Sequence, residues 1–378
     1  MRVALASDWF LPRTGGIELH LRDLALALRA RGVDARVVTT SPGAAEIDGV
    51  PVHRVRSATL PGTGVAMSPR ALARLGTLLR DEGFDVVHAH ASIVSPVAYA
   101  AAMTGARLRL PTVLTFHSML HRASLLLGAS EALFGWAAGR VLLTAVSGLV
   151  AEQAARWIPN ASVGVLPNGV DISFWRHDGV FRGHARDEVV LATAMRLTRK
   201  KRPFELLRAF AAASRFVAGA PRLRLIVAGD GPARAAMERT AADLGVRDAV
   251  ELTGQLDRAA LRALYRRSDL FVLPSERESF GIAALEARAA GLPVLAMLES
   301  GTRDFIAPGV NGLLARDHAE LGRFMGRVAL DQPLRRFFAV RNESPPHAYD
   351  WPTVVEQHLC CYATAAALRN GPDASSQR

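Results

Sequence analysis

Two carboxylates, Glu278 and Glu286, stand eight positions apart around the start of an expected helix. Eight residues of helix would span roughly 12 Å. Between the carboxylates, the first N–H groups of the helix have no partner within it and favour an anion. We assign this anion site to Ser279, Phe280, Gly281 and Ile282. A nucleotide-sugar has the matching layout, with a hexose at one end, a diphosphate in the middle and a ribose at the other. One of these glutamates without the other would be an ordinary charged residue and would not indicate a binding site.

A second group of candidate residues is basic. Arg196 follows an expected strand, and Lys201 comes five residues later, so both side chains could reach one diphosphate. The 46 basic residues include only two lysines, Lys200 and Lys201, and the rest are arginines. Lysine is a compact point charge and arginine a planar fork, so the two are not interchangeable at a crowded phosphate. We therefore favour Lys201 as a phosphate ligand over a basic loop without function.

The stretch ESFGIAALEARAAGLPV, from Glu278 to Val294, resembles the E-x7-E signature of retaining GT-B glycosyltransferases of family four. The resemblance extends over most of the chain. It implies an α/β fold with two facing Rossmann-like domains, whose sheets are parallel, and a C-terminal helix that crosses back to the first domain. It also implies transfer of a hexose from a UDP- or GDP-linked donor to an acceptor hydroxyl, with retention of configuration and without a metal ion.

The resemblance also suggests roles for individual residues. Glu278 would hold the hexose hydroxyls and Glu286 the ribose hydroxyls, while Arg196 and Lys201 occur at the family's spacing for binding the diphosphate. Gly15 and Gly16 match the family's glycine loop at the entrance of the first helix.

His117 is the candidate histidine. It ends the expected strand TVLTFHSM, and the carboxyl end of a parallel strand faces the ligand crevice. The position resembles the family's TxH element, in which the histidine lies beside the donor sugar. The alternation of His88 and His90 places both on one face of another strand, where they either support an acceptor pocket or are hydrogen-bonded core residues.

The elements that must position these residues alternate between strand and helix. SDLFVLP is a short apolar run typical of a buried strand, a polar loop follows, and the Ala- and Leu-rich helix after Gly281 ends at Ala290–Pro293. Asp257 is the expected N-cap of the preceding helix. Such alternation favours a doubly wound parallel sheet.

The same alternation begins at the N-terminus, where RVALAS is the first strand and is followed by a helix from about residue 17 to 31. We expect an acceptor-binding domain at residues 1–172, joined by a C-terminal helix at about 352–368. A nucleotide-sugar-binding domain is expected at 187–345. The polar stretch Arg176–Asp187 is the expected linker, and Arg369–Arg378 is expected to be disordered.

Composition sets limits on partners and compartment. The formal net charge of +11 suits an anionic donor or a membrane surface, and no nucleic-acid-binding motif is present. Cys360 and Cys361 are adjacent and have no other partner, which favours a reducing cytoplasm. The apolar region Ser124–Val150 is interrupted by charges, and we interpret it as buried helix.

The acceptor is left open as a glycan, a lipid or a small molecule. Peripheral contact with the inner face of a membrane is one interpretation of the arginine-bearing helix SPRALARLGTLLRDEGF, and an ordinary surface helix is the other. Leu120–Gly139 could line an acceptor site or touch lipid. No cofactor and no metal are expected, because no DxD motif occurs between strands. The alternatives are a GT-B nucleotide-sugar epimerase, an NAD-dependent oxidoreductase and a non-catalytic carbohydrate- or lipid-binding protein. The absence of a GxGxxG motif counts against the oxidoreductase.

Overall fold

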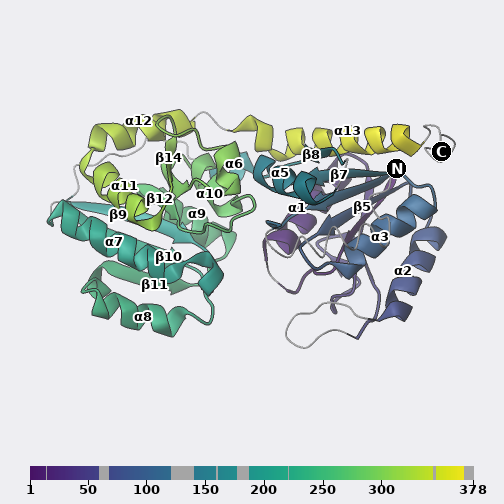
Figure 1. The fold of residues 1–378 in the computed structure, drawn as a ribbon, viewed down its shortest axis with the longest axis horizontal. Helices are drawn as coiled ribbons and strands as arrows, with labels where there is room; N and C mark the ends of the chain where they lie inside the picture. Colours follow the sequence, from purple (N-terminus) through teal and green to yellow (C-terminus); the bar gives the residue numbers. More distant parts are fainter. Residues whose placement is uncertain are drawn as a thin grey trace. The chain divides into compact units, whose positions relative to one another are not determined.

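The computed structural model describes residues 1–13, 15–58, 68–120, 140–158, 161–176, 187–219, 221–343 and 346–369 (Figure 1). The chain divides into two compact units. Unit 1 comprises residues 1–169 and 348–378, and unit 2 comprises residues 170–347. Each unit contains its own sheet, flanked by helices.

Unit 1 is built on an eight-stranded sheet with the order β3-β4-β2-β1-β5-β6-β7-β8. All neighbouring strands are parallel except β3 and β4, which form an antiparallel edge pair that the sequence did not predict. The strands are β1 (Arg2–Ser7), β2 (Asp34–Thr39), β3 (Glu46–Ile47), β4 (Val50–Arg54), β5 (Val86–Ala91), β6 (Thr112–Phe116), β7 (Val141–Ala145) and β8 (Val163–Val165). The helices are α1 (Gly16–Ala30), α2 (Pro69–Asp81), α3 (Pro96–Arg107), α5 (Gly148–Trp157) and α13 (Trp351–Arg369).

Helices cover both faces of this sheet. On one face, α1 buries Leu21, Leu24 and Leu28 against β1, and α13 adds Val355 and Tyr362 to the same apolar core. On the other face, α3 packs so closely on β5 that a Cβ on Gly105 would lie 3.2 Å from the Cβ of Val87. The last helix thus returns to the N-terminal unit, as the sequence predicted (Figure 1).

Unit 2 is built on a six-stranded parallel sheet with the order β11-β10-β9-β12-β13-β14. The strands are β9 (Glu188–Ala194), β10 (Arg222–Ala228), β11 (Val250–Gly254), β12 (Leu270–Leu273), β13 (Val294–Met297) and β14 (Gly312–Ala315). The helices are α6 (Ile172–Trp175), α7 (Pro203–Val217), α8 (Arg234–Asp243), α9 (Arg258–Arg266), α10 (Ile282–Ala289), α11 (His318–Leu330) and α12 (Gln332–Glu343). The described residues also form short 3-10 turns, namely η1 (Arg199–Lys201), η2 (Arg247–Ala249), η3 (Gly301–Asp304) and, ahead of α13, η4 (His347–Tyr349).

The two faces of this sheet carry different helices. α7, α8 and α11 bury a large apolar core against β9 and β10, with Leu191, Phe210 and Met325 fully buried. On the opposite face, Phe271 of β12 meets Tyr265 of α9 edge-on, with ring centroids 5.7 Å apart. Asp257 caps α9 as predicted, since its carboxylate accepts a hydrogen bond from the backbone N–H of Ala260 at 2.7 Å.

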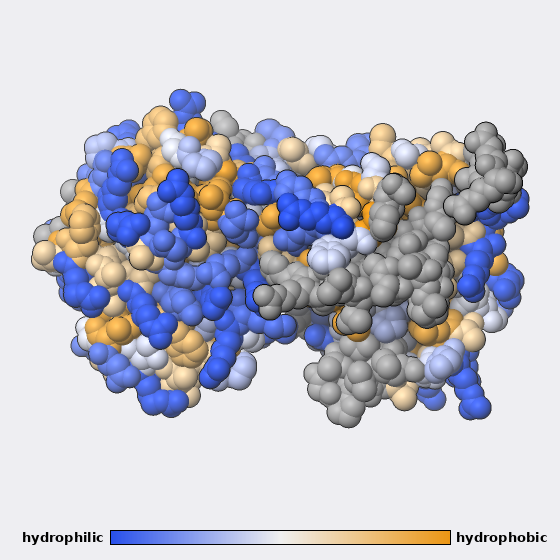
Figure 2. All heavy atoms as spheres, viewed as in Figure 1, coloured by the Kyte–Doolittle hydropathy of each residue, from blue (hydrophilic) through white to orange (hydrophobic). Residues whose placement is uncertain are grey.

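The predicted α/β fold with two parallel-stranded Rossmann-like units is therefore correct. Several other expectations fall mostly or wholly outside the described residues: the linker at Arg176–Asp187, the terminal segment Arg369–Arg378, the acceptor segment Leu120–Gly139 and the first part of Ser124–Val150. Among the described helices, none combines the length and apolarity that a membrane crossing requires. Hydrophilic side chains are scattered over the visible face of unit 2 rather than gathered in one block (Figure 2).

Candidate functional site

The first candidate site lies where the strand order of unit 2 reverses. β9 has β10 on one side and β12 on the other, so the loops that follow β9 and β12 are neighbours at the carboxyl edge of the sheet. Ligands bind at such switch points in open α/β sheets. Lys201 comes from the first loop and Glu278 from the second, and Nζ of Lys201 lies 2.5 Å from Oε2 of Glu278. The two candidates predicted from sequence are in direct contact.

A second set of charges supports these loops. Arg202, at the N-cap of α7, has a left-handed backbone with φ of 58° and donates to Glu276 at 2.7 Å. His318 at the start of α11 approaches the same carboxylate at 3.4 Å, and its Nε2 lies 2.9 Å from the carbonyl oxygen of Pro274. Glu276, Arg202 and His318 were not predicted as site residues from the sequence. Arg202 adjoins Lys201 and Glu276 lies two positions before Glu278, but closeness in sequence does not reveal their pairing, and no sequence signal connected His318 with them.

The turn before α10 is held by close backbone packing. Gly281 has φ of 92°, and a Cβ there would lie 2.6 Å from Cγ2 of Thr302. Gly301 donates its N–H to the carbonyl oxygen of Glu278 at 2.8 Å, and a Cβ on Gly301 would lie 2.1 Å from the carbonyl oxygen of Ser279. The η3 turn therefore packs against the loop that carries Glu278 and holds this loop in place.

The helical spacing expected between Glu278 and Glu286 is wrong. α10 begins at Ile282, and residues 278–281 form a loop, so a helical rise does not set the separation of the two carboxylates. The helix end at which we expected an anion is also shifted. Its first N–H groups are those of Ile282 and Ala283, whereas Ser279 and Phe280 belong to the preceding loop. The N–H of Ala284 already bonds to the carbonyl oxygen of Gly281 at 2.9 Å.

Glu286 lies half-buried on α10. The ring of Tyr265 lies beneath this helix and donates its hydroxyl to the carbonyl oxygen of Ala283 at 3.3 Å. Burial raises the pKa of Tyr265 well above its ordinary value, and the negative charge of Glu286 adds to that rise. The phenol therefore stays protonated as a hydrogen-bond donor.

Arg196 is exposed, two residues beyond the end of β9. The backbone on both sides of it is pinned to the loop after β10, because Met195 N–H bonds to Ala228 O at 2.9 Å and Leu197 N–H to Asp230 O at 2.8 Å. A Cβ on Gly229 would lie 1.9 Å from the carbonyl oxygen of Met195, so only glycine permits this approach. The segment that presents Arg196 is thus rigidly held at the same edge as Lys201.

In unit 1, the strand order reverses between β1 and β5. Gly15 is the N-cap residue of α1, and a Cβ on it would lie 2.4 Å from Oε2 of Glu18. Gly16 is exposed at the first position of the helix.

Asp8, directly after β1, is buried and accepts hydrogen bonds from the backbone of Val97 and Ala98 at the start of α3. Burial raises the pKa of Asp8 to about 6, although these hydrogen bonds oppose the rise.

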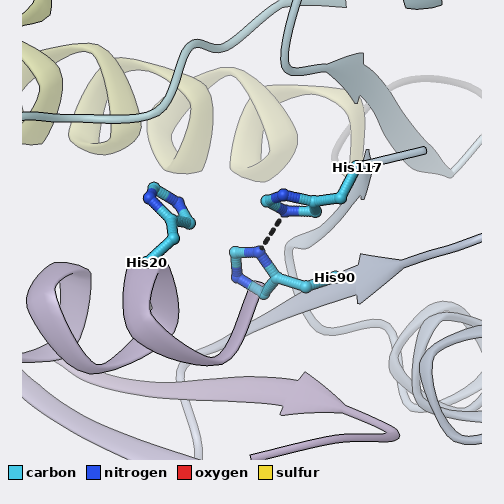
Figure 3. A group of neighbouring side chains, drawn as sticks. All are labelled: His20, His90 and His117. Carbon is cyan, nitrogen blue, oxygen red and sulfur yellow. Dashed lines mark hydrogen bonds between the residues drawn. The ribbon is translucent and has the colours of Figure 1, made fainter. Parts of the chain in front are cut away.

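His117 directly follows β6, and its N–H bonds to the carbonyl oxygen of Ala91 at 2.8 Å. Its Nε2 lies 2.9 Å from Nδ1 of His90, on the neighbouring strand (Figure 3). Burial lowers the pKa of His117 to about 3, so the imidazole is neutral at physiological pH. Within unit 1, His117 is therefore a hydrogen-bonded neutral imidazole at the carboxyl edge of the sheet.

Further aromatic residues extend this group across the face covered by α1 and α13. His88 contacts Oγ1 of Thr115 at 2.7 Å and the hydroxyl of Tyr362 at 3.0 Å. His20 of α1 stacks on Trp351, with ring centroids 5.6 Å apart. His88 and His90 are both hydrogen-bonded, which agrees with the interpretation that they are core residues rather than supports of an acceptor pocket. His20, His358, Trp351 and Tyr362 were not recognised, because α13 meets α1 and β5 only after the chain returns.

Comparison with known proteins decides the family. Residues 14–174 match the model described as Glycosyltransferase Family 4, and residues 180–339 match that described as Glycosyl transferases group 1. A D-inositol 3-phosphate glycosyltransferase from Actinosynnema mirum is 31% identical, over 93% of this chain and 92% of the relative. The chain belongs to glycosyltransferase family 4. A phosphatidyl-myo-inositol mannosyltransferase from Mycobacterium leprae is 27% identical, with 97% of each chain covered.

Solved structures agree with this family at the level of the fold. Sucrose-phosphate synthase from Thermosynechococcus elongatus aligns with a TM-score of 0.73 at 20% identity, covering 97% of this chain and 99% of that one. Anabaena HepE in complex with UDP and glucose aligns with a TM-score of 0.75 at 21% identity, covering 96% and 99%. The GT-B fold of this family 4 glycosyltransferase matches the predicted fold class.

Proposed function

We propose that this glycosyltransferase moves a hexosyl group from a UDP- or GDP-linked sugar to an acceptor hydroxyl, with retention of anomeric configuration. The observation that carries the proposal is the contact between Lys201 and Glu278 beside the N-terminus of α10. It combines a cation for the diphosphate with a carboxylate for sugar hydroxyls at the switch point of one sheet. Family membership and the likeness to a structure that holds UDP and glucose support the same donor class.

The difficult step breaks the bond between the anomeric carbon and the phosphate oxygen. Negative charge then grows on the leaving diphosphate, and groups already aimed at that position lower the barrier. Lys201, Arg196 and the first N–H groups of α10 are the proposed donors. A unit charge about 4 Å from a phosphate oxygen contributes roughly 4 kcal/mol at an effective dielectric constant near 20. We propose that this positive charge replaces a metal ion at the donor diphosphate.

The carboxylates have separate roles in this proposal. Glu278 orients Lys201 and accepts hydrogen bonds from the hexose hydroxyls, while Glu286 accepts them from the ribose. His117 is assigned to the donor sugar through the family resemblance. As a neutral imidazole, it would position a hydroxyl and would not serve as a cation. The proton of the acceptor hydroxyl would pass to the leaving phosphate.

The acceptor proposal rests on the relatives. Those named for D-inositol 3-phosphate and phosphatidyl-myo-inositol make an inositol-bearing acceptor the first class to examine. The proposed compartment is the cytoplasm, with peripheral contact at a membrane if the acceptor is a lipid.

The function can be tested in two steps. A thermal-shift panel of UDP, GDP, ADP and their sugars should show stabilisation by one diphosphate and its sugar. The stabilising donor is then incubated with inositol phosphate or phosphatidylinositol vesicles, and NMR of the product determines the anomeric configuration. Release of a free hexose isomer without acceptor would indicate an epimerase instead. A folded protein that no nucleotide stabilises would contradict the proposal.

A further inference from the structure

Arg202 has a backbone conformation that is unfavourable for an arginine. Its φ of 58° and ψ of 44° lie in the left-handed region. Glycine enters this region without strain, whereas a residue with a Cβ is strained there. Strained positions of this kind persist where the surrounding structure holds them, and they concentrate at ligand sites. The side chain of Arg202 is therefore expected to contribute an interaction that glycine cannot supply.

The side chain of Arg202 joins the two loops that carry the proposed donor residues. Its Nε and Nη2 both donate to Oε2 of Glu276, at 3.1 and 2.7 Å. Arg202 directly follows Lys201, and Glu276 precedes Glu278 by two positions. The ion pair between Arg202 and Glu276 therefore connects the same two loops as the contact between Lys201 and Glu278.

Glu276 also has a neighbour on a third element. Nδ1 of His318, the first residue of α11, lies 3.4 Å from Oε1 of Glu276. The other ring nitrogen of His318, Nε2, lies 2.9 Å from the carbonyl oxygen of Pro274. A carbonyl oxygen can only accept, so Nε2 carries the hydrogen and donates it. His318 thus holds the start of the loop that follows β12, while Arg202 holds Glu276 within it.

The contact between Lys201 and Glu278 must be shared when a donor binds. In the proposed function, the ammonium group of Lys201 also binds the diphosphate, and Glu278 also accepts hydrogen bonds from the hexose. An ammonium group has three N–H donors, so it can serve both partners, but its charge no longer faces Glu278 alone. Groups that contact a ligand need neighbours that hold them within a fraction of an ångström. A second link between the two loops would supply that support.

We propose that Arg202 and Glu276 are positioning residues of the donor site. Their ion pair holds Lys201 and Glu278 in place for the diphosphate and the hexose. This inference rests on the proposed function and names the residues that keep its two donor contacts aligned. Both side chains of the pair are 37% exposed, and ion pairs this exposed contribute little to stability. Loss of the pair should therefore change donor binding much more than the free energy of unfolding.

The test measures donor affinity in the full-length protein by calorimetry. The probes are UDP with UDP-glucose and GDP with GDP-mannose, and the pair of probes that binds the wild type is kept. Arg202→Ala and Glu276→Ala should each weaken binding by about tenfold or more, because a small misplacement of aligned groups has large effects. The double variant should lose no more than either single variant, since both changes remove the same contact.

A second ion pair of unit 2 provides the matched control. Arg224 on β10 lies 2.6 Å from Glu251 on β11, and their side chains are 44% and 37% exposed. This pair also joins two neighbouring parts of the sheet, but it has no role in the proposed donor site. Arg224→Ala should leave the affinity for the nucleotide near that of the wild type.

Two further substitutions at Arg202 separate positioning from a purely structural role. Arg202→Lys keeps a positive charge and should retain more affinity than Arg202→Ala. Arg202→Gly removes the side chain but suits the positive φ, so its stability in urea should equal or exceed that of the wild type. Its affinity should nevertheless fall by about tenfold or more, as in Arg202→Ala. A structural role alone would not lower affinity in a protein of undiminished stability.

The outcomes decide between positioning and its alternatives. Weaker binding in both single variants, with no further loss in the double variant, supports the proposal. Weaker binding in Arg202→Ala but not in Glu276→Ala would show that Arg202 contacts the phosphate directly and would overturn it. Additive losses in the double variant would overturn it as well.

The same measurements distinguish failure of this inference from failure of the proposed function. Full affinity in folded Arg202→Gly and Glu276→Ala, next to a wild type that binds nucleotide, would overturn only the positioning role. A folded wild type that binds none of these nucleotides would contradict the proposed function and this inference together. If the alanine variants fail to fold, Arg202→Gly and Arg202→Lys decide the question.

Discussion

Nζ of Lys201 lies 2.5 Å from Oε2 of Glu278, although the two residues are separated by 77 positions in the chain. The lysine side chain is 31% exposed and the glutamate side chain 14%. Because both side chains are partly buried, the cost of removing them from water offsets much of their mutual attraction, so the pair is weak evidence for stability. We therefore expect the pair to matter by positioning a charge. Glu278 holds the ammonium group of Lys201 at the carboxyl edge of the sheet, where a diphosphate would bind.

Lys201→Ala should lower turnover by about a hundredfold or more, as removal of one preorganised donor typically does. Steady-state kinetics with the identified donor measure this loss. Lys200→Ala is the matched control, because Lys200 is the adjacent lysine and is exposed, and its turnover should stay near that of the wild type. Near-normal turnover in folded Lys201→Ala protein would rule out the phosphate role.

Glu286→Ala should weaken nucleotide binding more than it slows the chemical step, because its proposed partner is the ribose. Calorimetry with the nucleoside diphosphate measures the affinity, and kinetics at a saturating concentration of the donor measure turnover. Glu278→Gln should show the opposite pattern, because its proposed partner is the reacting sugar. Unchanged nucleotide affinity in Glu286→Ala would count against the ribose assignment.

Gly281→Ala should destabilise unit 2 more than Gly309→Ala. Both positions have positive φ, 92° and 79°, so alanine is strained at each by roughly 1–2 kcal/mol. A Cβ at Gly281 also lies 2.6 Å from Cγ2 of Thr302, whereas a Cβ at Gly309 has no described atom within 4 Å. Urea unfolding of both variants measures the difference, and equal losses of stability would show that the contact with Thr302 is unimportant.

Asp8 should make unit 1 less stable as the pH rises. Its pKa in the folded protein is about 6, above the ordinary 3.8, so the folded state holds the proton more tightly than the unfolded state. The stabilisation is complete below pH 3.8 and is lost as the pH passes through 6, by up to about 3 kcal/mol. Unfolding free energies of wild type and Asp8→Asn, compared at pH 4 and pH 7, isolate this effect. A difference between the two proteins that does not change with pH would contradict it.

The sequence predicted the parts of the fold that local patterns determine. The apolar run of β12, the glycine before α10 and the cap at Asp257 depend on residues close together in the chain, and all three were placed correctly. The separation of roughly 12 Å expected between Glu278 and Glu286 does not follow, because it counted all eight positions as helix. Residues 278–281 form a loop, and α10 begins at Ile282.

Contacts between distant segments were not predictable in the same way. The pairing of Arg202 with Glu276 depends on the neighbouring positions of β9 and β12, which chain order does not reveal. The histidine cluster depends on α1, β5 and β6 meeting on the same face, beneath a helix that comes more than two hundred residues later. Side-chain type suggested the chemistry of these residues, and only the tertiary structure shows their partners.

The return of α13 to unit 1 has a consequence for how the protein is made. Unit 2 is a continuous insertion, whereas unit 1 needs both ends of the chain to complete its core. During synthesis, unit 2 can therefore fold before Val355 and Tyr362 have left the ribosome, while the earlier-made N-terminal half still exposes apolar surface. Chains truncated after residue 347 and released from the ribosome should resist protease in unit 2 (residues 170–347) and remain sensitive in residues 1–169, which makes that half the part most in need of a chaperone.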